Sequence, residues 1–251
     1  TIRRIVLTTA EVSTVAGEPT IQGSQDGVGA AARFRRPKGL AADSAGNLYV
    51  ADTDNCTIRK IELATGAVTT FLGEPSQCGA TDGIAPAARV SSPQGLVLDG
   101  TGNLYVADAD YGSIRKVVLG TGAVSTLPPA LPVRRPNDLA CDGAGNVYVT
   151  DGETHTVTRV SLTGQGARTG AGQPILVGGA DGVGAQASFW GPSALVSDSQ
   201  GGVFVANSYF NAIRKIDVSS GQVTTLAGSP EGLAGSRDDI GVTARFGNPT
   251  A

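Results

Sequence analysis

The stretch Gly46-Asn-Leu-Tyr-Val-Ala-Asp52 decides the fold, because the same seven positions return three more times along the chain. The later copies are Gly102-Asn-Leu-Tyr-Val-Ala-Asp108, Gly145-Asn-Val-Tyr-Val-Thr-Asp151 and Gly201-Gly-Val-Phe-Val-Ala-Asn207. A unit that recurs at a regular spacing and has an apolar face must bury that face against its neighbours. The chain therefore consists of several copies of one structural unit.

Prolines give the length of the unit. Successive prolines at the same phase are 56, 43, 56 and 57 residues apart, namely Pro37, Pro93, Pro136, Pro192 and Pro249. Turn residues divide each unit into four short strands, which in the first complete copy are predicted at 40–43, 47–52, 57–63 and 67–72. The Asp43 carboxylate is expected to hold the backbone N–H groups of the first hairpin, where Gly46 supplies a positive φ.

Four-stranded antiparallel units at this spacing predict a β-propeller, in which radial repetition leaves only short, protected edges. A β-sandwich is the alternative all-β fold, but its strands need not repeat their sequence. Strand two is apolar on both faces, as expected for a sheet that lies between other sheets.

The repeat resembles that of the NHL-repeat propellers. The resemblance rests on Pro37-Lys-Gly-Leu-Ala-Ala-Asp43, on the stretch ending at Asp52 and on Asn55-Cys-Thr-Ile-Arg-Lys-Ile61, and it covers nearly the whole chain. Bacterial proteins of this type carry a longer unit with an Asp-Gly insertion, here at Asp26, Asp82, Asp181 and Asp238, which the 43-residue third unit lacks. The resemblance implies a fold and a mode of use, but no substrate.

Residues 1–251 are predicted to form one propeller domain. Four complete blades are expected at 34–73, 90–128, 133–172 and 189–228, and a split blade is expected to combine strands three and four from 1–17 with a start at 245–251. The complete ring would then have five or six blades. The inner strands of the split blade come either from a longer protein, of which this chain is an excerpt, or from a neighbouring subunit by strand addition.

Composition narrows the classes of partner. The formal net charge is −3, which disfavours nucleic acid as a partner, and no stretch approaches the roughly 20 apolar residues of a membrane helix. Basic pairs recur in the third strands: Arg3-Arg4, Arg59-Lys60, Arg115-Lys116 and Arg214-Lys215. We interpret them as solvated charges of the outer strands.

Cysteines suggest the compartment. Cys56 and Cys78 flank strands three and four of one blade, in connections that emerge at the same end of an antiparallel sheet. A disulfide between them is predicted, and with it an extracellular or cell-surface location. Cys141 lies in a predicted inner strand and is expected to be a small buried core residue.

No catalytic residue is predicted, and the protein is expected not to be an enzyme. The single histidine, His155, excludes a multi-histidine zinc site. Four polar residues at equivalent strand ends are weak candidates for calcium ligands: Asp52, Asp108, Asp151 and Asn207. A simpler interpretation is that each blade ends this strand with the same kind of polar residue. The Asp-Gly insertions are interpreted as caps of helical turns. No cofactor is expected, and a metal-dependent lactonase or lyase at the channel mouth is the enzymatic alternative.

The sequence therefore predicts a binding scaffold whose loop-bearing face contacts a protein or another surface ligand. The residues expected on this face are Asn55, Tyr111, His155, Tyr209 and Phe210. Aromatic residues in loops suit an interface, although the three listed here could instead pack on their own insertion loops. The structural alternative is a subunit of an extracellular fibre, joined head to tail through the open blade.

Overall fold

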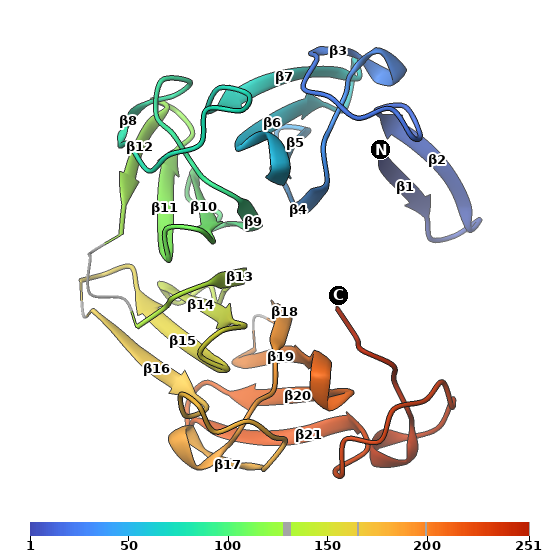
Figure 1. The fold of residues 1–251 in the computed structure, drawn as a ribbon, viewed down its shortest axis with the longest axis vertical. Helices are drawn as coiled ribbons and strands as arrows, with labels where there is room; N and C mark the ends of the chain where they lie inside the picture. Colours follow the sequence, from blue (N-terminus) through green and yellow to red (C-terminus); the bar gives the residue numbers. More distant parts are fainter. Residues whose placement is uncertain (128–131, 165, 199, 251) are drawn as a thin grey trace. The chain divides into compact units, whose positions relative to one another are not determined.

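The computed structural model describes residues 1–127, 132–164, 166–198 and 200–250, and its regular structure is almost entirely β (Figure 1). Residues 1–111 and 115–126 form one compact unit, and residues 112–114 and 127–251 form a second; each is described by itself. Both units consist of antiparallel sheets, and the four main strands of each blade lie side by side in sequence order. These sheets are the blades of a β-propeller, as the repeat predicts.

The first unit contains a two-stranded sheet, blade one and all of blade two except Ser113 and Ile114 at the start of β11. The two-stranded sheet is β1 (Ile2–Val6) with β2 (Glu11–Ala16). Blade one has the order β3-β7-β6-β5-β4, from β3 (Gly27–Val28), β4 (Pro37–Ala42), β5 (Asn47–Asp52), β6 (Thr57–Glu62) and β7 (Ala67–Leu72). Blade two has the order β8-β12-β11-β10-β9, from β8 (Gly83–Ile84), β9 (Pro93–Leu98), β10 (Asn103–Asp108), β11 (Ser113–Val118) and β12 (Ala123–Thr126).

The second unit contains two blades that differ in strand number. Blade three has four strands in sequence order, β13 (Pro136–Cys141), β14 (Asn146–Asp151), β15 (Thr156–Ser161) and β16 (Ala167–Ala171). Blade four has the order β17-β21-β20-β19-β18, from β17 (Gly182–Val183), β18 (Pro192–Ser197), β19 (Gly202–Asn207), β20 (Ala212–Asp217) and β21 (Gln222–Gly228).

Three blades therefore carry an edge strand that the sequence did not predict. The Asp-Gly insertion forms the two-residue strands β3, β8 and β17, each antiparallel to the fourth strand of its blade. Blade three lacks the insertion and has no such strand among its described residues. An edge strand this short covers the outer edge of the blade and offers little edge of its own.

The first hairpin of each blade is built as predicted. Asp43 Oδ1 accepts the N–H groups of Ala45 at 2.9 Å and Asn47 at 2.8 Å, and Gly46 has a φ of 84°. Asp99, Asp142 and Asp198 hold the equivalent turns. The carboxylate thus fixes the register in which strand one pairs with strand two.

Each unit has its own apolar core between neighbouring sheets. In the first unit, Leu72, Val90 and Leu104 are buried in one cluster that joins blades one and two. In the second, Val157, Phe189 and Val205 belong to a cluster that joins blades three and four. Apolar residues on both faces of the inner strands are what allow a blade to pack on two sides.

The short helices are single 3₁₀ turns: η1 (Gly29–Ala31), η2 (Thr53–Asn55), η3 (Gly184–Gln186), η4 (Ser208–Phe210) and η5 (Gly241–Thr243). Among the described residues, no helix has the length and apolarity that a membrane span requires.

Candidate functional site

The second strand of every blade ends with a polar residue. Asp52, Asp108, Asp151 and Asn207 are completely buried. Each accepts a backbone N–H from the segment 17 residues earlier, at 2.7 Å from Arg35, 2.9 Å from Ser91, 2.5 Å from Arg134 and 2.6 Å from Trp190. These weak calcium candidates lie at the ends of four different sheets, where protein donors occupy them. No group of three or more His, Cys, Asp or Glu that could hold a metal gathers among the described residues.

The prediction of solvated charges in the third strand is wrong for three arginines. Arg59, Arg115 and Arg214 have no exposed surface, whereas the lysines that follow them are partly exposed. Arg59 lies 3.1 Å from buried Asp52, and Arg115 lies 3.5 Å from buried Asp108. Burial raises the pKa of Asp52, and that of Asp108 to about 7, against the lowering effect of these donors.

The prediction that the Asp-Gly insertions cap helical turns is also wrong. None of the three turns that follow Asp26, Asp181 and Asp238 has a side-chain cap. Instead Asp26 lies 2.5 Å from Arg59 and accepts the hydroxyl of Thr70 at 3.1 Å. Asp82 with Arg115, and Asp181 with Arg214, repeat the ion pair at 2.7 Å. The insertion therefore neutralises the buried arginine, which Phe34 and Phe189 also cover in blades one and four.

Blade three lacks both halves of this arrangement. Thr158 occupies the position of Arg59 in the strand register, opposite Thr169 as Arg59 is opposite Thr70. The blade without the insertion is thus the blade without the arginine. Both absences are visible when the sequences of the four units are aligned. They indicate that the inserted aspartate and the third-strand arginine contact each other.

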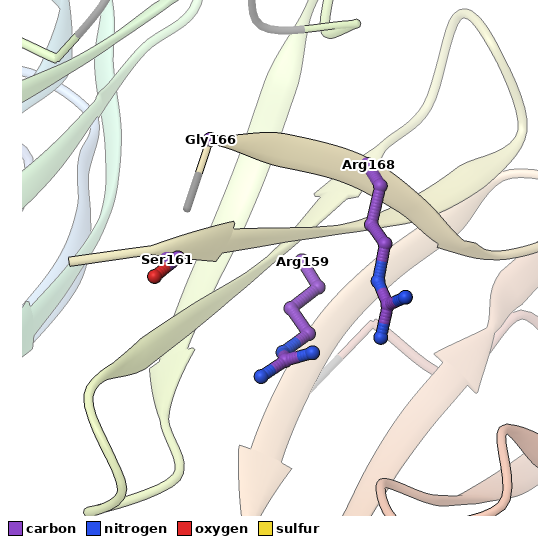
Figure 2. Close-up of a pocket in the computed structure, with 4 residues that line it drawn as sticks. All are labelled: Arg159, Ser161, Gly166 and Arg168. Atoms are coloured by element: carbon purple, nitrogen blue, oxygen red, sulfur yellow. The ribbon is translucent and has the colours of Figure 1, made fainter. Parts of the chain in front are cut away.

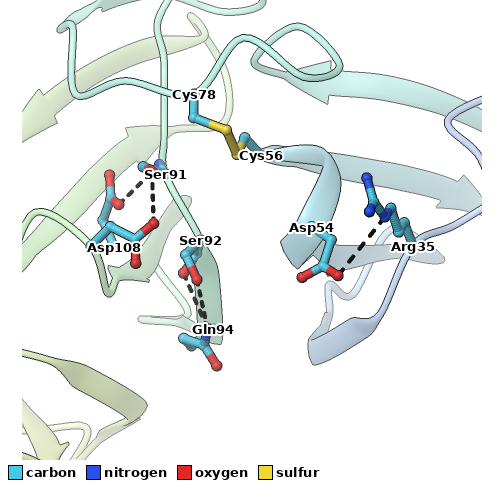
Figure 3. The surroundings of a disulfide bond; sticks show 9 residues. Arg35, Asp54, Cys56, Cys78, Ser91, Ser92, Gln94 and Asp108 are labelled. Carbon is cyan, nitrogen blue, oxygen red and sulfur yellow. Dashed lines mark hydrogen bonds and ion pairs between the residues drawn. A yellow bond between two sulfur atoms is a disulfide. The ribbon is translucent and has the colours of Figure 1, made fainter.

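Cys56 and Cys78 form the predicted disulfide, with their Cα atoms 5.2 Å apart (Figure 3). Cys56 ends η2 in the left-handed conformation, with a φ of 56°, and Cys78 lies in the connection that leads to blade two. The bond therefore ties the end of strand two in blade one to the segment that enters the next blade. Cys141 is half-buried at the end of β13, so the expectation of a fully buried residue is wrong.

The residues expected on the binding face differ in exposure. Asn55 is only 4% exposed and donates to the carbonyl of Gly23 at 2.7 Å and to Asp52 at 2.8 Å, so it is internal. Phe210 is half-buried, with its ring against Gly179 and Gly232, on its own connecting segments. Tyr111 in the first unit is 56% exposed.

Tyr209 and His155 both lie beside Gly191 in the second unit, next to Trp190, a residue that the sequence did not indicate. Trp190, the single tryptophan, is 44% exposed and packs edge to face on Tyr209, with ring centres 6.3 Å apart; Tyr209 is 60% exposed. His155 Nδ1 accepts the N–H of Gly191 at 3.1 Å, from the neighbouring blade. We call Trp190 and Tyr209 the aromatic platform.

Backbone bonds fix the platform. The carbonyl of Trp190 accepts the N–H of Tyr209 at 3.1 Å, and that of Gly191 accepts the N–H of Ser208 at 3.2 Å. Gly191 has a φ of 61°, and a Cβ there would lie 2.4 Å from the Tyr209 ring. Only glycine at this position therefore leaves room for the tyrosine.

The platform breaks the symmetry of the repeat. Residues at the two equivalent positions, 19 apart, are polar in the other three blades. Arg35 and Asp54 form an ion pair at 3.9 Å, Ser91 donates to Asp110 at 3.1 Å, and Arg134 lies 3.7 Å from Glu153. Blade four replaces this surface pair by two exposed rings, which no demand of the blade core explains.

The model of the NHL repeat matches residues 34–61. The chain is 35% identical over 100 residues to Protein SUPPRESSOR OF QUENCHING 1, chloroplastic, of Arabidopsis thaliana, a match that covers 40% of this chain and 9% of that protein. It is 38% identical over 97 residues to NHL repeat-containing protein 2 of Bos taurus, covering 35% and 13% respectively. The chain thus matches only a small part of these relatives.

Solved structures share the fold at low identity. An auxiliary nutrient binding protein from Bacteroides thetaiotaomicron superposes with a TM-score of 0.59 at 18% identity, over 94% of this chain and 69% of that one. Virginiamycin B lyase from Staphylococcus aureus gives a TM-score of 0.55 at 16% identity, over 76% and 55%. At these identities the likeness concerns the fold alone.

Proposed function

Because the chain is a β-propeller built from NHL repeats, we propose that it is a non-enzymatic interaction scaffold that binds a protein or another surface ligand. The aromatic platform carries this proposal. The other three blades carry a polar pair at the positions of Trp190 and Tyr209, so the propeller fold does not require aromatic rings there. Tryptophan and tyrosine are the residue types most enriched at the centres of interfaces.

The platform suits a ligand that brings an apolar group with a polar rim. Two half-exposed rings in edge-to-face contact offer a rigid apolar surface, and their geometry is already fixed by the backbone bonds of Trp190 and Gly191. A preformed surface loses little conformational entropy when a partner covers it. The half-buried His155 adds a polar group beside the rings.

A double substitution tests the proposal. Changing Trp190→Arg together with Tyr209→Glu installs the pair that blade three carries at Arg134 and Glu153. Partners are enriched on the immobilised chain and then titrated against purified protein, and the Trp190 fluorescence of the parent chain is followed. We expect a partner that shields Trp190 from acrylamide quenching and loses at least about 2 kcal/mol of binding free energy with the double variant.

The matched control replaces Arg134 and Glu153 by alanine, which removes the equivalent pair from blade three and should leave binding unchanged. Equal Tm values for the parent chain and both variants would show that the platform is dispensable for folding. If every enriched partner binds the double variant as tightly as the parent chain, the platform is not the binding surface and the proposal is wrong.

We also propose that the scaffold works outside the cytosol, in the extracellular space or at a cell surface. The Cys56–Cys78 disulfide supports this location, because such bonds persist in oxidising compartments. Alkylation of reduced cysteines in protein taken directly from its source, followed by mass measurement, should find only Cys141 modified. Modification of all three cysteines would place the chain in a reducing compartment.

A second candidate function is self-association through β1 and β2. These strands form a two-stranded sheet whose apolar side chains Ile5 and Val12 are 60% and 50% exposed. Strand addition to such a sheet would cover them. Light scattering should then show a mass that rises with concentration and falls to the monomer for Ile5→Lys. The control is Ile240→Lys, which changes an 88% exposed residue of the second unit.

A further inference from the structure

Two arginines face each other across blade three. Arg159 in β15 is the direct partner of Arg168 in β16. The equivalent pairs in the other blades are a lysine opposite a small hydroxyl residue: Lys60 with Thr69, Lys116 with Ser125, and Lys215 with Thr224. Like charges directly opposite each other in an antiparallel pair are destabilising, so this pair costs stability in the unliganded protein.

No ion pair within the described residues neutralises either arginine. Neither arginine forms an ion pair within the described ranges, and the positions outside those ranges carry no Asp or Glu. Arg159 is half-buried and its Nε has no hydrogen-bond partner, whereas Arg168 is exposed. Figure 2 shows the two side chains extending from adjacent strands on the same side of the sheet. Their charge is thus concentrated in one place.

Both arginines line a cavity of about 390 Å³ between blades three and four of the second unit. Val157, Ile216 and Val218 supply apolar wall, and Tyr148 supplies a hydroxyl group. Asp217 also lines the cavity, and its Oδ1 accepts the hydroxyl groups of Ser219 at 2.6 Å and Ser220 at 2.8 Å. A smaller hollow of about 160 Å³ continues past the same arginines to Ser161 and Gly166 (Figure 2). The larger volume lies within the range of roughly 300–1,000 Å³ that small-molecule sites occupy.

We propose that Arg159 and Arg168 bind the oxyanion of a small ligand, a carboxylate or a phosphate, whose body lies in the cavity between blades three and four. The planar guanidinium group matches both oxyanions with two parallel N–H donors. Binding replaces the repulsion between the two arginines by two attractive contacts, and the apolar wall accommodates the remainder of the ligand. Burial raises the pKa of Tyr148, so its hydroxyl keeps the proton it can donate.

Arg168→Thr tests the site, because it restores the residue type that blades one and four carry at this position. Inorganic phosphate and citrate are titrated separately by calorimetry, at constant ionic strength set with sodium chloride. We expect millimolar or tighter binding of at least one anion to the parent chain and a loss of about tenfold or more in affinity for the variant. Binding of one probe alone identifies the oxyanion class.

Two further variants complete the test. Arg159→Lys keeps the charge but removes the two parallel N–H donors of the guanidinium group, and it should weaken binding less than Arg168→Thr does. Arg4→Thr makes the same charge change at an exposed residue of β1 and should leave binding unchanged. Without ligand, Arg168→Thr should also raise Tm, since it removes the like-charge contact. The proposal is overturned if neither anion binds, or if Arg4→Thr weakens binding as much as Arg168→Thr.

Discussion

Asp26 reaches the guanidinium group of Arg59 at 2.5 Å although the two residues are 33 positions apart, Asp26 just before the edge strand β3 and Arg59 in the central strand β6 of blade one. Arg59 is completely buried, whereas the Asp26 side chain is 50% exposed. The same separation of 33 joins Asp82 to Arg115 and Asp181 to Arg214. In blades one and two, the buried arginine thus lies between the aspartate at the end of strand two and the aspartate that precedes the inserted edge strand.

Replacing Arg59 by threonine, the residue of blade three, should destabilise the first unit by about 3–5 kcal/mol, because it leaves the buried Asp52 without its cation. Asp26→Asn should cost only about 1 kcal/mol or less, because solvent screens the half-exposed carboxylate. Urea unfolding of both variants measures the difference. Equal costs would show that the buried and exposed carboxylates contribute alike.

Loss of the disulfide should destabilise the first unit. Cys56 and Cys78 enclose a sequence separation of 22 residues, for which chain entropy gives a contribution of about 3 kcal/mol. A variant with serine at both positions should therefore unfold at lower urea concentration, and a reducing agent should shift the parent chain to the same midpoint. Cys141→Ser is the control: it keeps the disulfide, so the reductant should shift its midpoint as it shifts that of the parent chain, whereas the variant with serine at 56 and 78 should not respond.

Asp138→Asn should stabilise the second unit at neutral pH. Asp138 stands where blade one has Gly39 and accepts the N–H of Leu195 at 3.1 Å, and burial raises its pKa to about 6. The folded state therefore binds this proton more tightly than the unfolded state, so the carboxyl costs stability increasingly as pH rises from about 4 to 6. After screening by the solvent that reaches this half-buried group, the gain at pH 7 should be on the order of 1–2 kcal/mol.

The measurement is the Tm of Asp138→Asn minus that of the parent chain between pH 4 and pH 8. This difference should be near zero at pH 4, rise through pH 5 to 6 and then stay constant. A difference that does not change with pH would mean that Asp138 titrates alike in the folded and unfolded states.

Gly191→Ala should disturb the aromatic platform selectively. A Cβ at this position would lie 2.4 Å from the Tyr209 ring and would need a positive φ. We expect a loss of about 1–3 kcal/mol in stability and a change in Trp190 fluorescence, because the Tyr209 ring has to move. Gly100→Ala is the control: its φ is also positive, but it has open space around it. Unchanged fluorescence in Gly191→Ala would contradict the packing described here.

Periodicity predicted the main strands well because each inner strand has a strong apolar pattern. The predicted 47–52 and 67–72 coincide with β5 and β7, while β4 begins at Pro37, before the predicted Leu40, because a bulge lies between these residues. The edge strands were missed because two residues such as Gly27 and Val28 carry no period.

Side-chain environments were harder to predict than strands. An arginine in an outer strand is ordinarily solvated, and only a comparison of units, in which Thr158 accompanies the missing insertion, indicates a buried ion pair. Likewise, Trp190 lies in a connection without any pattern of its own. Its contact with Tyr209 depends on the backbone path at Gly191, which the strand pattern does not specify.

The pairing of Asp26 with Arg59 also defines which piece of this chain can be transplanted. A chimera cut just before strand one, at Pro37, would carry the arginine but leave its neutralising carboxylate behind. The segment that can be exchanged between propellers as a self-sufficient cassette begins at Asp26 and extends at least to Thr70, whose hydroxyl binds the same carboxylate. Blade three, with Thr158 and no insertion, needs no such upstream carboxylate, and its cassette begins at Arg134, whose N–H binds Asp151.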